Sequence, residues 1–414
     1  MAVFRPFAAV RPLPEYAERV AALPYDVMSS AEAREMAEGN PYSFLHVDKA
    51  EIDLAPSIDL YDARVYEKAR ENLEKLVADG VCAQDQKPCF YIYRQIMDDR
   101  AQTGLVGCAS IDDYRDNVIK KHEFTRADKE ADRIRHVDTC DANTGPIFLT
   151  CRPQARLHAI MESWKASYMP VYDFTQDDVR QTVWVVDDSA VIAALAKAVS
   201  ELDALYIADG HHRAASAVRV GEQRREANPG YTGEEEFNFF LAVLFSSDDL
   251  AIMDYNRVVK DLNGYTVEEF LKTIEEKFEV SPYADDGAFH PEQSHTFGLY
   301  LGGQWYCLTA RAGTFPADDP VASLDVSILQ ENLLGPVLGI GDPRTDKRID
   351  FVGGIRGLGE LEKRAASDMQ LAFSMCPTTL EELMAIADAG KVMPPKSTWF
   401  EPKLLSGLFI HKLK

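Results

Sequence analysis

A short apolar run that passes through an Asp-Gly pair into an alanine-rich helix constrains the fold of this chain more than any other feature. Residues 204–208 read as a strand, Asp209 and Gly210 as a tight turn, and the residues from Arg213 onward as the first turn of a helix. Helix N-termini present unpaired backbone N–H groups and the positive end of the helix dipole, and both attract phosphate oxygens. The stretch therefore predicts an anion-binding junction within an α/β unit.

The polar side chains at this junction are suited to phosphate chemistry. Arg213 can grip phosphate oxygens bidentately, and His211 and His212 titrate near neutral pH. Asp209 can cap the helix or help to hold a metal ion. The alternative is a capped turn with two surface histidines, but the flanking Asp and Arg favour a functional site. The predicted phosphate or nucleotide site comprises Asp209, Gly210, His211, His212 and Arg213, with Asp209 as the predicted metal ligand.

The acidic composition limits the partners that such a chain can have. Its 414 residues carry a formal net charge of −23. Nucleic-acid binders gain most of their affinity from Lys and Arg side chains that neutralise phosphates, and binding to an anionic membrane surface uses the same charges. Both kinds of partner are therefore disfavoured, and a phosphate site must be a local basic pocket on an acidic protein.

Cysteine usage and the N-terminus indicate the compartment. The seven cysteines are scattered without a CxxC pair, so neither a zinc ribbon nor a disulfide framework is predicted. The first residues lack the apolar segment of a secretory signal, and no apolar run approaches the roughly 18 residues of a membrane span. We expect a cytoplasmic protein without membrane contact.

The length predicts two or three compact units, since single domains cluster at roughly 100 to 200 residues. We expect a mixed α+β fold with an α/β core domain over residues 1–260 and a satellite α+β domain over residues 261–322. Residues 323–414 are expected to pack back on the core. Hairpins are predicted at residues 89–110 and 296–308.

Residues 120–136 form the densest cluster of ionisable groups in the chain. His122 and Glu123 lack the second histidine of an HExxH signature, so a metalloprotease is not indicated. One interpretation is a solvated helix with ion pairs four residues apart. The other is a site in which imidazole and carboxylate groups act as bases beside anion-binding side chains. In that interpretation Glu123, His122 and His211 are catalytic, and Arg126, Arg133 and His136 bind the substrate.

A proline-stiffened loop near the C-terminus offers further donors. Lys396, Ser397 and Thr398 can donate hydrogen bonds to a phosphate or carboxylate, so we assign them to the phosphate site. The alternative is a Pro-rich entry into a final apolar strand at residues 404–410. The apolar and aromatic character of this tail predicts that it packs instead of fraying.

Several motifs occur together in one order along the chain. They are Pro-Tyr-Asp-Val at 24–27, Asn-Pro-Tyr-Ser-Phe-Leu-His-Val at 40–47, His-Glu-Phe-Thr at 122–125, Ala-Asp-Gly-His-His-Arg at 208–213, and Met-Pro-Pro-Lys-Ser-Thr-Trp-Phe at 393–400. With these motifs the chain is identified as a member of the bacterial and archaeal family called domain of unknown function 1015.

The Asp-Gly-His-His-Arg turn is also similar to the phosphate-binding turn of the ParB and sulfiredoxin superfamily, whose members bind nucleotides and include free-serine kinases. This resemblance implies a ParB/sulfiredoxin-like core in which residues 209–213 hold nucleotide phosphates. It also implies a carboxylate that deprotonates the substrate hydroxyl. The motif does not fix that carboxylate, and we assign the role to Glu123 from the chemistry of its own cluster.

The predicted function is that of a phosphotransferase or phosphatase for a small metabolite, plausibly serine or phosphoserine, with Mg²⁺ and ATP or ADP. Phosphoryl transfer depends mostly on positioning and on stabilising charge, which Arg and His side chains provide. The alternative is a non-catalytic regulatory protein that binds a nucleotide or metabolite, since a sensor needs ligand contacts and no base. A DNA-binding regulator is disfavoured by the charge. The direction of transfer, the choice of nucleotide and the oligomeric state are left open.

Overall fold

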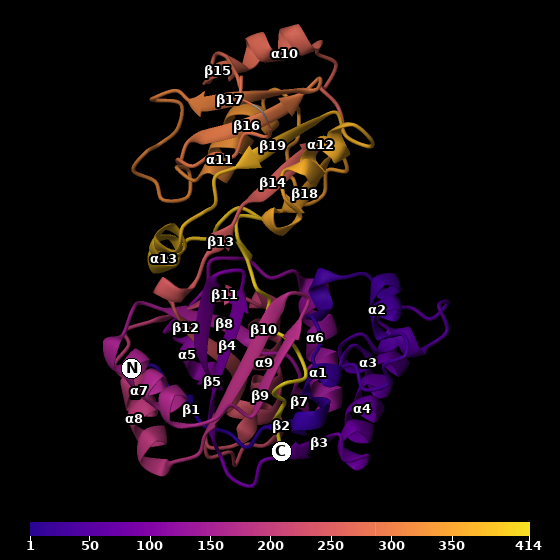
Figure 1. The fold of residues 1–414 in the computed structure, drawn as a ribbon, viewed down its shortest axis with the longest axis vertical. Coiled ribbons are helices and arrows are strands. Elements are labelled where there is room, and N and C mark those ends of the chain that lie inside the picture. Colours follow the sequence, from indigo (N-terminus) through magenta and orange to yellow (C-terminus); the bar gives the residue numbers. More distant parts are fainter. Residues whose placement is uncertain (286) are drawn as a thin grey trace. The chain divides into compact units, whose positions relative to one another are not determined.

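The computed structural model describes residues 1–285 and 287–414, which divide into two compact units (Figure 1). The first unit comprises Met1–Leu250 and Pro402–Lys414, and the second comprises Ala251–Glu401. The second unit extends beyond the satellite domain expected at residues 261–322. Residues 323–401 fold within it because β18 (Ile349–Gly353) and β19 (Leu371–Met375) both pair with β14 (Tyr255–Val259). The mixed α+β class predicted from the sequence is confirmed.

A nine-stranded mixed sheet forms the centre of the first unit, in the order β6-β11-β8-β12-β5-β4-β10-β9, with β1 paired to β5. β6 runs parallel to β11 and β8 parallel to β12, and the other neighbours are antiparallel. The predicted hairpin at residues 89–110 is the β4–β5 pair. The strands are β1 (Phe4–Arg5), β4 (Phe90–Met97), β5 (Arg100–Ser110), β6 (Ile119–Lys120), β8 (Ile147–Cys151), β9 (Tyr172–Gln176), β10 (Val179–Val186), β11 (Leu205–Asp209) and β12 (Phe239–Ser246).

Both faces of this sheet are buried, as β4 shows. Phe90 and Ile92 point into an apolar cluster that includes residues of α7 (Ala155–Ser167), α8 (Ser189–Ser200) and α9 (His211–Ala227). Tyr91 points to the opposite face, where its ring contacts Phe7 and Phe409. Successive strand side chains alternate between faces, so a strand covered on both sides reads as a continuous apolar run.

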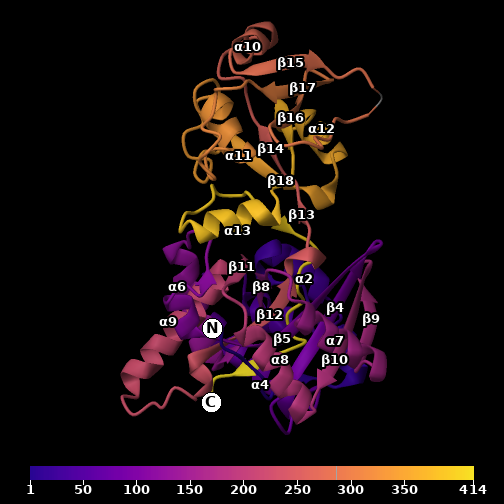
Figure 2. The same ribbon diagram turned by 90° about the vertical axis from the view of Figure 1, so that its left-hand side faces the viewer.

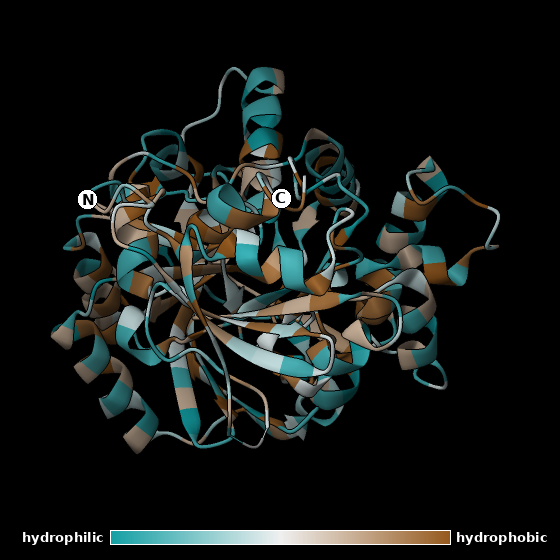
Figure 3. Cartoon of the chain, turned by 90° about the horizontal axis from the view of Figure 1, so that it is seen from above, coloured by the Kyte–Doolittle hydropathy of each residue, from teal (hydrophilic) through white to brown (hydrophobic). Residues whose placement is uncertain are grey.

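Helices of the N-terminal region build a second apolar cluster with the C-terminal residue Ile410. These helices are α1 (Ala17–Val20), α2 (Ser30–Ala37), α3 (Leu45–Asp48) and α4 (Ala63–Ala78), and α6 (Ala127–Cys140) adds Cys140. α6 also packs against α9. Figure 3 shows hydrophobic residues on both strands and helices, and hydrophilic residues along the outer helices and loops. No helix in the described part of the chain has the length and apolar character needed to cross a membrane.

Three chain segments meet at one edge of the sheet and so position the site. β6 and β11 are parallel, with Leu205 opposite Ile119, so both strands end at the same edge. β8 is antiparallel to β11, with Asp209 opposite Phe148, so β8 begins there. The turn after β11, the loop after β6 and the residues that precede β8 are therefore close in space.

The strand predicted at residues 404–410 is not formed. This segment instead makes isolated bridges, Ser406 with Ala22 and Ile410 with Val10. Gly407 interrupts the extended backbone with a φ of +86°, and an added Cβ would lie 2.7 Å from Phe44 Cγ. The segment is nevertheless buried, as its apolar sequence predicts. It ends in β21 (His411–Lys412), which pairs with β7 (Ala142–Asn143).

A six-stranded antiparallel sheet forms the second unit, in the order β15-β17-β16-β19-β14-β18 (Figure 2). The predicted hairpin across Gly302 and Gly303 is present as β16–β17. β13 pairs with β20, which brings Ile252 opposite Phe400, so the two crossings of the chain between the units run side by side. The bounds of the remaining elements of the second unit are β13 (Ile252–Met253), β15 (Phe278–Pro282), β16 (Thr296–Leu301), β17 (Gln304–Ala310), β20 (Trp399–Phe400), α10 (Val267–Ile274), α11 (Asp325–Leu329), α12 (Gly359–Ala365) and α13 (Leu380–Asp388).

Candidate functional site

The strand–turn–helix predicted from the sequence is formed by β11, Gly210 and α9. Gly210 is the N-cap of α9 and has a φ of 91°, in the left-handed region that favours glycine. Because glycine has no side chain that could accept a hydrogen bond, the first turn of the helix has no side-chain cap from Gly210. The backbone N–H groups at the start of α9 are therefore left for a bound anion.

Cationic side chains surround the carboxylate at this turn. Lys403 Nζ lies 3.5 Å and an Arg213 Nη 3.7 Å from Asp209 Oδ2, and the Gly210 N–H donates to Asp209 Oδ1 at 2.9 Å. Burial opposes ionisation of Asp209, but the charges of Lys403 and Arg213 outweigh it and hold the pKa of this carboxyl below its ordinary value. Asp209 is thus anionic at neutral pH and orients both cations.

Arg213 folds back over the turn instead of pointing into solvent. Its Nη1 donates to the Pro146 carbonyl at 2.6 Å, and its Nε is buried without a hydrogen-bond partner among the described residues. A Cβ at Gly210 would lie 3.1 Å from Arg213 Nε, so a side chain there would press on the guanidinium. A buried guanidinium N–H without an acceptor is costly, so this donor is available to an anion that enters the turn.

Two buried imidazoles lie beside the turn, and a carboxylate lies next to them. The rings of His122 and His211 pack edge to face with centroids 4.5 Å apart, and Glu123 Oε2 lies 3.7 Å from His211 Nδ1. Burial lowers the pKa of His122 to about 4, and burial also lowers the pKa of His211 well below its usual range. Both rings are neutral at pH 7, and neither nitrogen of His122 makes a hydrogen bond of ordinary geometry with the described residues.

His212 and Arg126 have structural partners. The Arg126 backbone N–H donates to His212 Nε2 at 3.0 Å, which ties the loop after β6 to the first turn of α9. The Arg126 guanidinium pairs with Asp128 at 2.8 Å, and its side chain is 66% exposed. The part of this cluster that resembles a solvated helix surface is thus the segment around Arg126 and Asp128.

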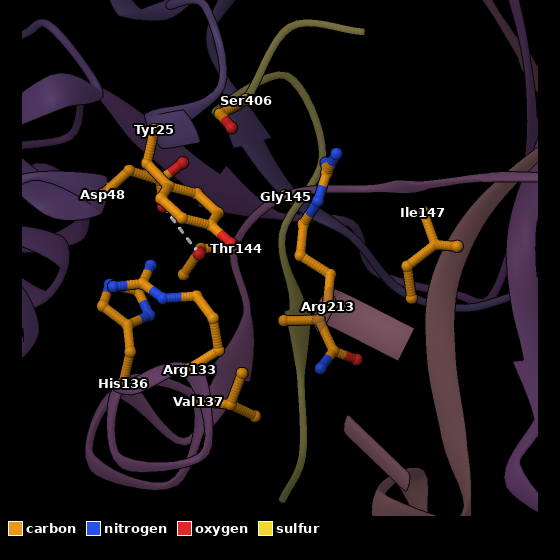
Figure 4. A pocket seen from close by; sticks show the side chains of 11 residues that line it. Tyr25, Asp48, Arg133, His136, Val137, Thr144, Gly145, Ile147, Arg213 and Ser406 are labelled. Atoms are coloured by element: carbon orange, nitrogen blue, oxygen red, sulfur yellow. Dashed lines mark hydrogen bonds between the residues drawn. The ribbon is translucent and has the colours of Figure 1, made fainter. Parts of the chain in front are cut away.

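Arg133 and His136 line a small pocket that Arg213 shares (Figure 4). Both side chains lie on the buried face of α6, and this face of the helix is directed toward the turn. The Tyr25 ring lies 4.2 Å from the Arg133 guanidinium carbon. The other lining residues are Asp48, Val137, Asn143, Thr144, Gly145, Ile147 and Ser406.

The pocket combines donors and acceptors in a desolvated setting. Asp48 accepts a hydrogen bond from Thr144 Oγ1 at 2.8 Å, and Arg133 pairs with Asp132 at 2.9 Å. Burial raises the pKa of Tyr25, and burial lowers the pKa of His136, with the Arg133 charge acting in the same direction. A polar ligand that enters here meets a guanidinium, a carboxylate, a phenol and a neutral imidazole.

Lys396, Ser397 and Thr398 belong to the second unit, so the first-unit site is built without them. Lys396 has a φ of 60°, and its ammonium lies 5.4 Å from the centre of the Tyr255 ring. Ser397 Oγ donates to the Pro394 carbonyl at 2.6 Å, and the Ser397 carbonyl accepts from Thr378 Oγ1 at 3.0 Å. These bonds order the loop within its own unit.

Sequence reasoning missed several residues that the structure places at the site. Lys403 contacts Asp209 because the tail returns to the first unit, where Gln95 Nε2 holds the Lys403 carbonyl at 2.9 Å. Tyr25 lies in one of the motifs quoted above, and that motif is the only signal for it. Asp48 and Thr144 carry none, since each is a single polar residue that only tertiary packing brings to Arg133 and Arg213.

The protein ligands for a metal ion are few at this turn. No group of three His, Cys, Asp or Glu side chains suited to holding a metal occurs in the part of the chain that the structure describes. Asp209 is already paired with Lys403 and Arg213. A cation at the turn would therefore take most of its ligands from a bound phosphate, as Mg²⁺ commonly does.

Comparison with known proteins places this site in a family. A family model described as "Protein of unknown function (DUF1015)" matches residues 4–327. The chain belongs to this family. Its match contains the turn after β11 and the loop after β6, and the membership predicted from the motifs is confirmed. No curated protein matches the chain.

The chain is weakly similar to solved structures over about three quarters of its length. A free serine kinase in complex with AMP is 15% identical, with a TM-score of 0.35 over 75% of this chain and 87% of that chain. A mutant free serine kinase in complex with ADP is 15% identical, with a TM-score of 0.36 over 75% and 87%. SbnI with C-terminal truncation from Staphylococcus aureus is 10% identical, with a TM-score of 0.36 over 73% and 85%.

Proposed function

We propose that this protein transfers or removes a phosphoryl group on a small metabolite, with serine or phosphoserine as the first candidates and ATP or ADP as the nucleotide. The turn between β11 and α9 carries the proposal. Its uncapped helix start, the unpartnered Nε of Arg213 and the Lys403 ammonium beside Asp209 all lie at this turn. These are the groups that stabilise the charge of a transferring phosphoryl group.

Glu123 is the proposed general base of the reaction. Its side chain is 46% exposed, so a substrate hydroxyl can reach it, and its carboxylate lies 3.7 Å from His211 Nδ1. The proton of the hydroxyl passes to Glu123 as the hydroxyl oxygen attacks the terminal phosphorus atom of the nucleotide. The bond from that phosphorus to the bridging oxygen breaks, and the shortened nucleotide (ADP from ATP, AMP from ADP) leaves with the electron pair of the broken bond. His211 is neutral and buried, with the His122 ring packed against it, and it positions the carboxylate.

The pocket beside the turn, about 20 Å³ in volume, is proposed to take one polar end of the metabolite. Arg213 borders both the turn and the pocket, so a ligand in the pocket lies next to a phosphate at the turn. Arg133 and His136 keep their proposed substrate-binding role. Arg126 is less available for substrate binding, because its guanidinium is paired with Asp128.

The proposal also includes Mg²⁺ at the turn. Mg²⁺ would neutralise nucleotide phosphate charge, with Asp209 as the protein carboxylate within the turn. His212 contributes a ring and a backbone N–H at the helix start.

A non-catalytic regulatory protein that binds a nucleotide or metabolite is the second candidate. The same turn would serve such a protein, and an anion site needs no base. What favours the enzyme is the carboxylate of Glu123 beside His211, at the same helix start as the anion site.

Nucleotide binding tests the proposal most simply. Thermal unfolding of the full chain is followed with ATP, ADP, serine and phosphoserine, with and without Mg²⁺. A ligand present at 100 times its Kd stabilises the folded state by about 2.7 kcal/mol. We expect this shift with nucleotide in the native protein and its loss in Arg213→Ala.

Arg219→Ala is the matched control, since Arg219 lies on the same helix, is 53% exposed and pairs with Glu222 at the surface. It should respond to nucleotide as the native protein does. A native protein that shows no shift with any of these ligands would refute the phosphate site.

A further inference from the structure

The loop after β6 crosses the start of α9 and is held there at two points. On one side of its centre, the buried His122 ring packs against His211. On the other side, the Arg126 N–H donates to His212 Nε2 at 3.0 Å. Thr125 Oγ1 also donates to Glu130 at 2.9 Å, which ties the loop to α6. The middle of the loop is therefore fixed over the helix start.

Phe124 occupies this middle position and is 72% exposed, more than any other aromatic ring among the described residues. An isolated exposed apolar side chain needs no explanation on its own. Here its place is specific, because it lies two residues from each anchor. A chain spans at most 3.3 to 3.6 Å per residue, so the Phe124 backbone lies within about 7 Å of the anchoring residues along the chain.

The neighbours of Phe124 tie it to the proposed chemistry. Glu123, the preceding residue, reaches to 3.7 Å from His211 Nδ1. The phosphate turn lies on the same helix start, with Gly210 as its N-cap. A nucleotide whose phosphates bind at this turn needs a surface for its aromatic base several ångströms away, and an exposed phenyl ring offers the face on which bases stack.

We propose that Phe124 is the stacking surface for the base of the nucleotide bound at the turn. This inference rests on the proposed function, because it assumes that the ligand at the turn is a nucleotide. It assigns Phe124 a positioning role: the ring holds the base, and the base fixes the direction in which the phosphate chain enters. Selection for a nucleoside phosphate over inorganic phosphates follows from the same contact.

The test compares ligands with and without a base on the full chain. Isothermal titration calorimetry gives the Kd for ADP, ATP and inorganic pyrophosphate with native protein, Phe124→Ala and Phe124→Trp. Loss of one aromatic–base stack weakens binding by roughly 5- to 150-fold. We expect this loss for ADP and ATP in Phe124→Ala, unchanged pyrophosphate binding, and recovery in Phe124→Trp with a change in tryptophan fluorescence on nucleotide addition.

Tyr265→Ala is the control, since Tyr265 is an exposed aromatic residue of the second unit. It should leave every Kd unchanged. Equal weakening of ADP and pyrophosphate in Phe124→Ala would overturn the inference, because the ring would then act only on the shape of the loop. Unchanged ADP binding in Phe124→Ala, with loss in Arg213→Ala, would overturn it while leaving the proposed function intact. Absence of any nucleotide binding to the native protein would overturn both.

Discussion

At the scale of single residues, the site combines an ionised carboxylate with neutral imidazoles. The cations Lys403 and Arg213 keep Asp209 ionised despite its burial. Burial keeps His122 neutral, because a charged ring would lose its hydration there. Groups whose pKa values are shifted in this way cluster at functional sites.

The buried His122 predicts a pH dependence of stability. Its pKa is about 4 in the folded protein and about 6.5 in the unfolded chain, so the unfolded chain binds the proton first as the pH falls. Stability is therefore present above pH 6.5 and is lost as the pH falls toward 4. From pH 7 to pH 5 this residue alone should cost about 2 kcal/mol. Urea unfolding at both pH values measures it.

His122→Gln provides the comparison, since the amide carries no titratable proton. Its free energy of unfolding should fall by about 2 kcal/mol less than that of the native protein between pH 7 and pH 5. Equal losses in the two proteins would show that His122 is not buried as a neutral ring.

At the scale of elements, the β11–Gly210–α9 junction depends on a backbone that only glycine adopts readily. Gly210→Ala should destabilise the first unit by about 1–2 kcal/mol, because its left-handed conformation disfavours a side chain. It should also weaken nucleotide binding, since the new Cβ would press on Arg213. Urea unfolding and thermal shifts with ADP measure the two effects.

Gly230→Ala is the matched substitution at a glycine with no atoms within 4 Å of the added Cβ and no left-handed φ. It should change neither stability nor binding appreciably. If Gly210→Ala behaved in the same way, the turn would not depend on its left-handed backbone.

The sequence predicts the elements that follow from neighbouring residues, and it does not predict those that depend on contacts between distant parts of the chain. The junction of β11 and α9 and the β4–β5 hairpin follow from local patterns, and both are where the sequence places them. The strand predicted at 404–410 fails because Gly407 turns beside Phe44, a contact between opposite ends of the chain. Asp48 and Thr144 reach the pocket through packing alone, which no local pattern encodes.

At the scale of the whole molecule, the chain crosses between two units twice, and the crossings run together. Ile252 pairs with Phe400 and Met253 with Trp399. Paired residues of antiparallel strands lie about 4.5–5.5 Å apart, so the ends left by removing the second unit lie close together. The tail from Pro402 onward must stay, because Lys403 and the buried residues of the tail belong to the first unit.

Replacing residues 251–401 by a short Gly-Ser linker should therefore yield a folded first unit that still binds nucleotide. We expect one cooperative urea transition and a thermal shift with ADP. A folded first unit that binds no nucleotide would show that the second unit supplies essential groups. A protein that ends at residue 401 is the contrasting form, and it should lose both the fold and the site.

Phosphoryl transfer itself tests the central claim most directly. The purified full chain is incubated with Mg²⁺, serine and either ATP or ADP, and phosphoserine is followed by phosphorus NMR, with the reverse reaction started from phosphoserine and AMP or ADP. We predict turnover in the native protein and a loss of about 100-fold or more in Glu123→Gln, as for removal of a general base, with nucleotide affinity retained. Nucleotide binding without turnover in either direction, and with no effect of Glu123→Gln, would contradict the account and identify a binding protein instead.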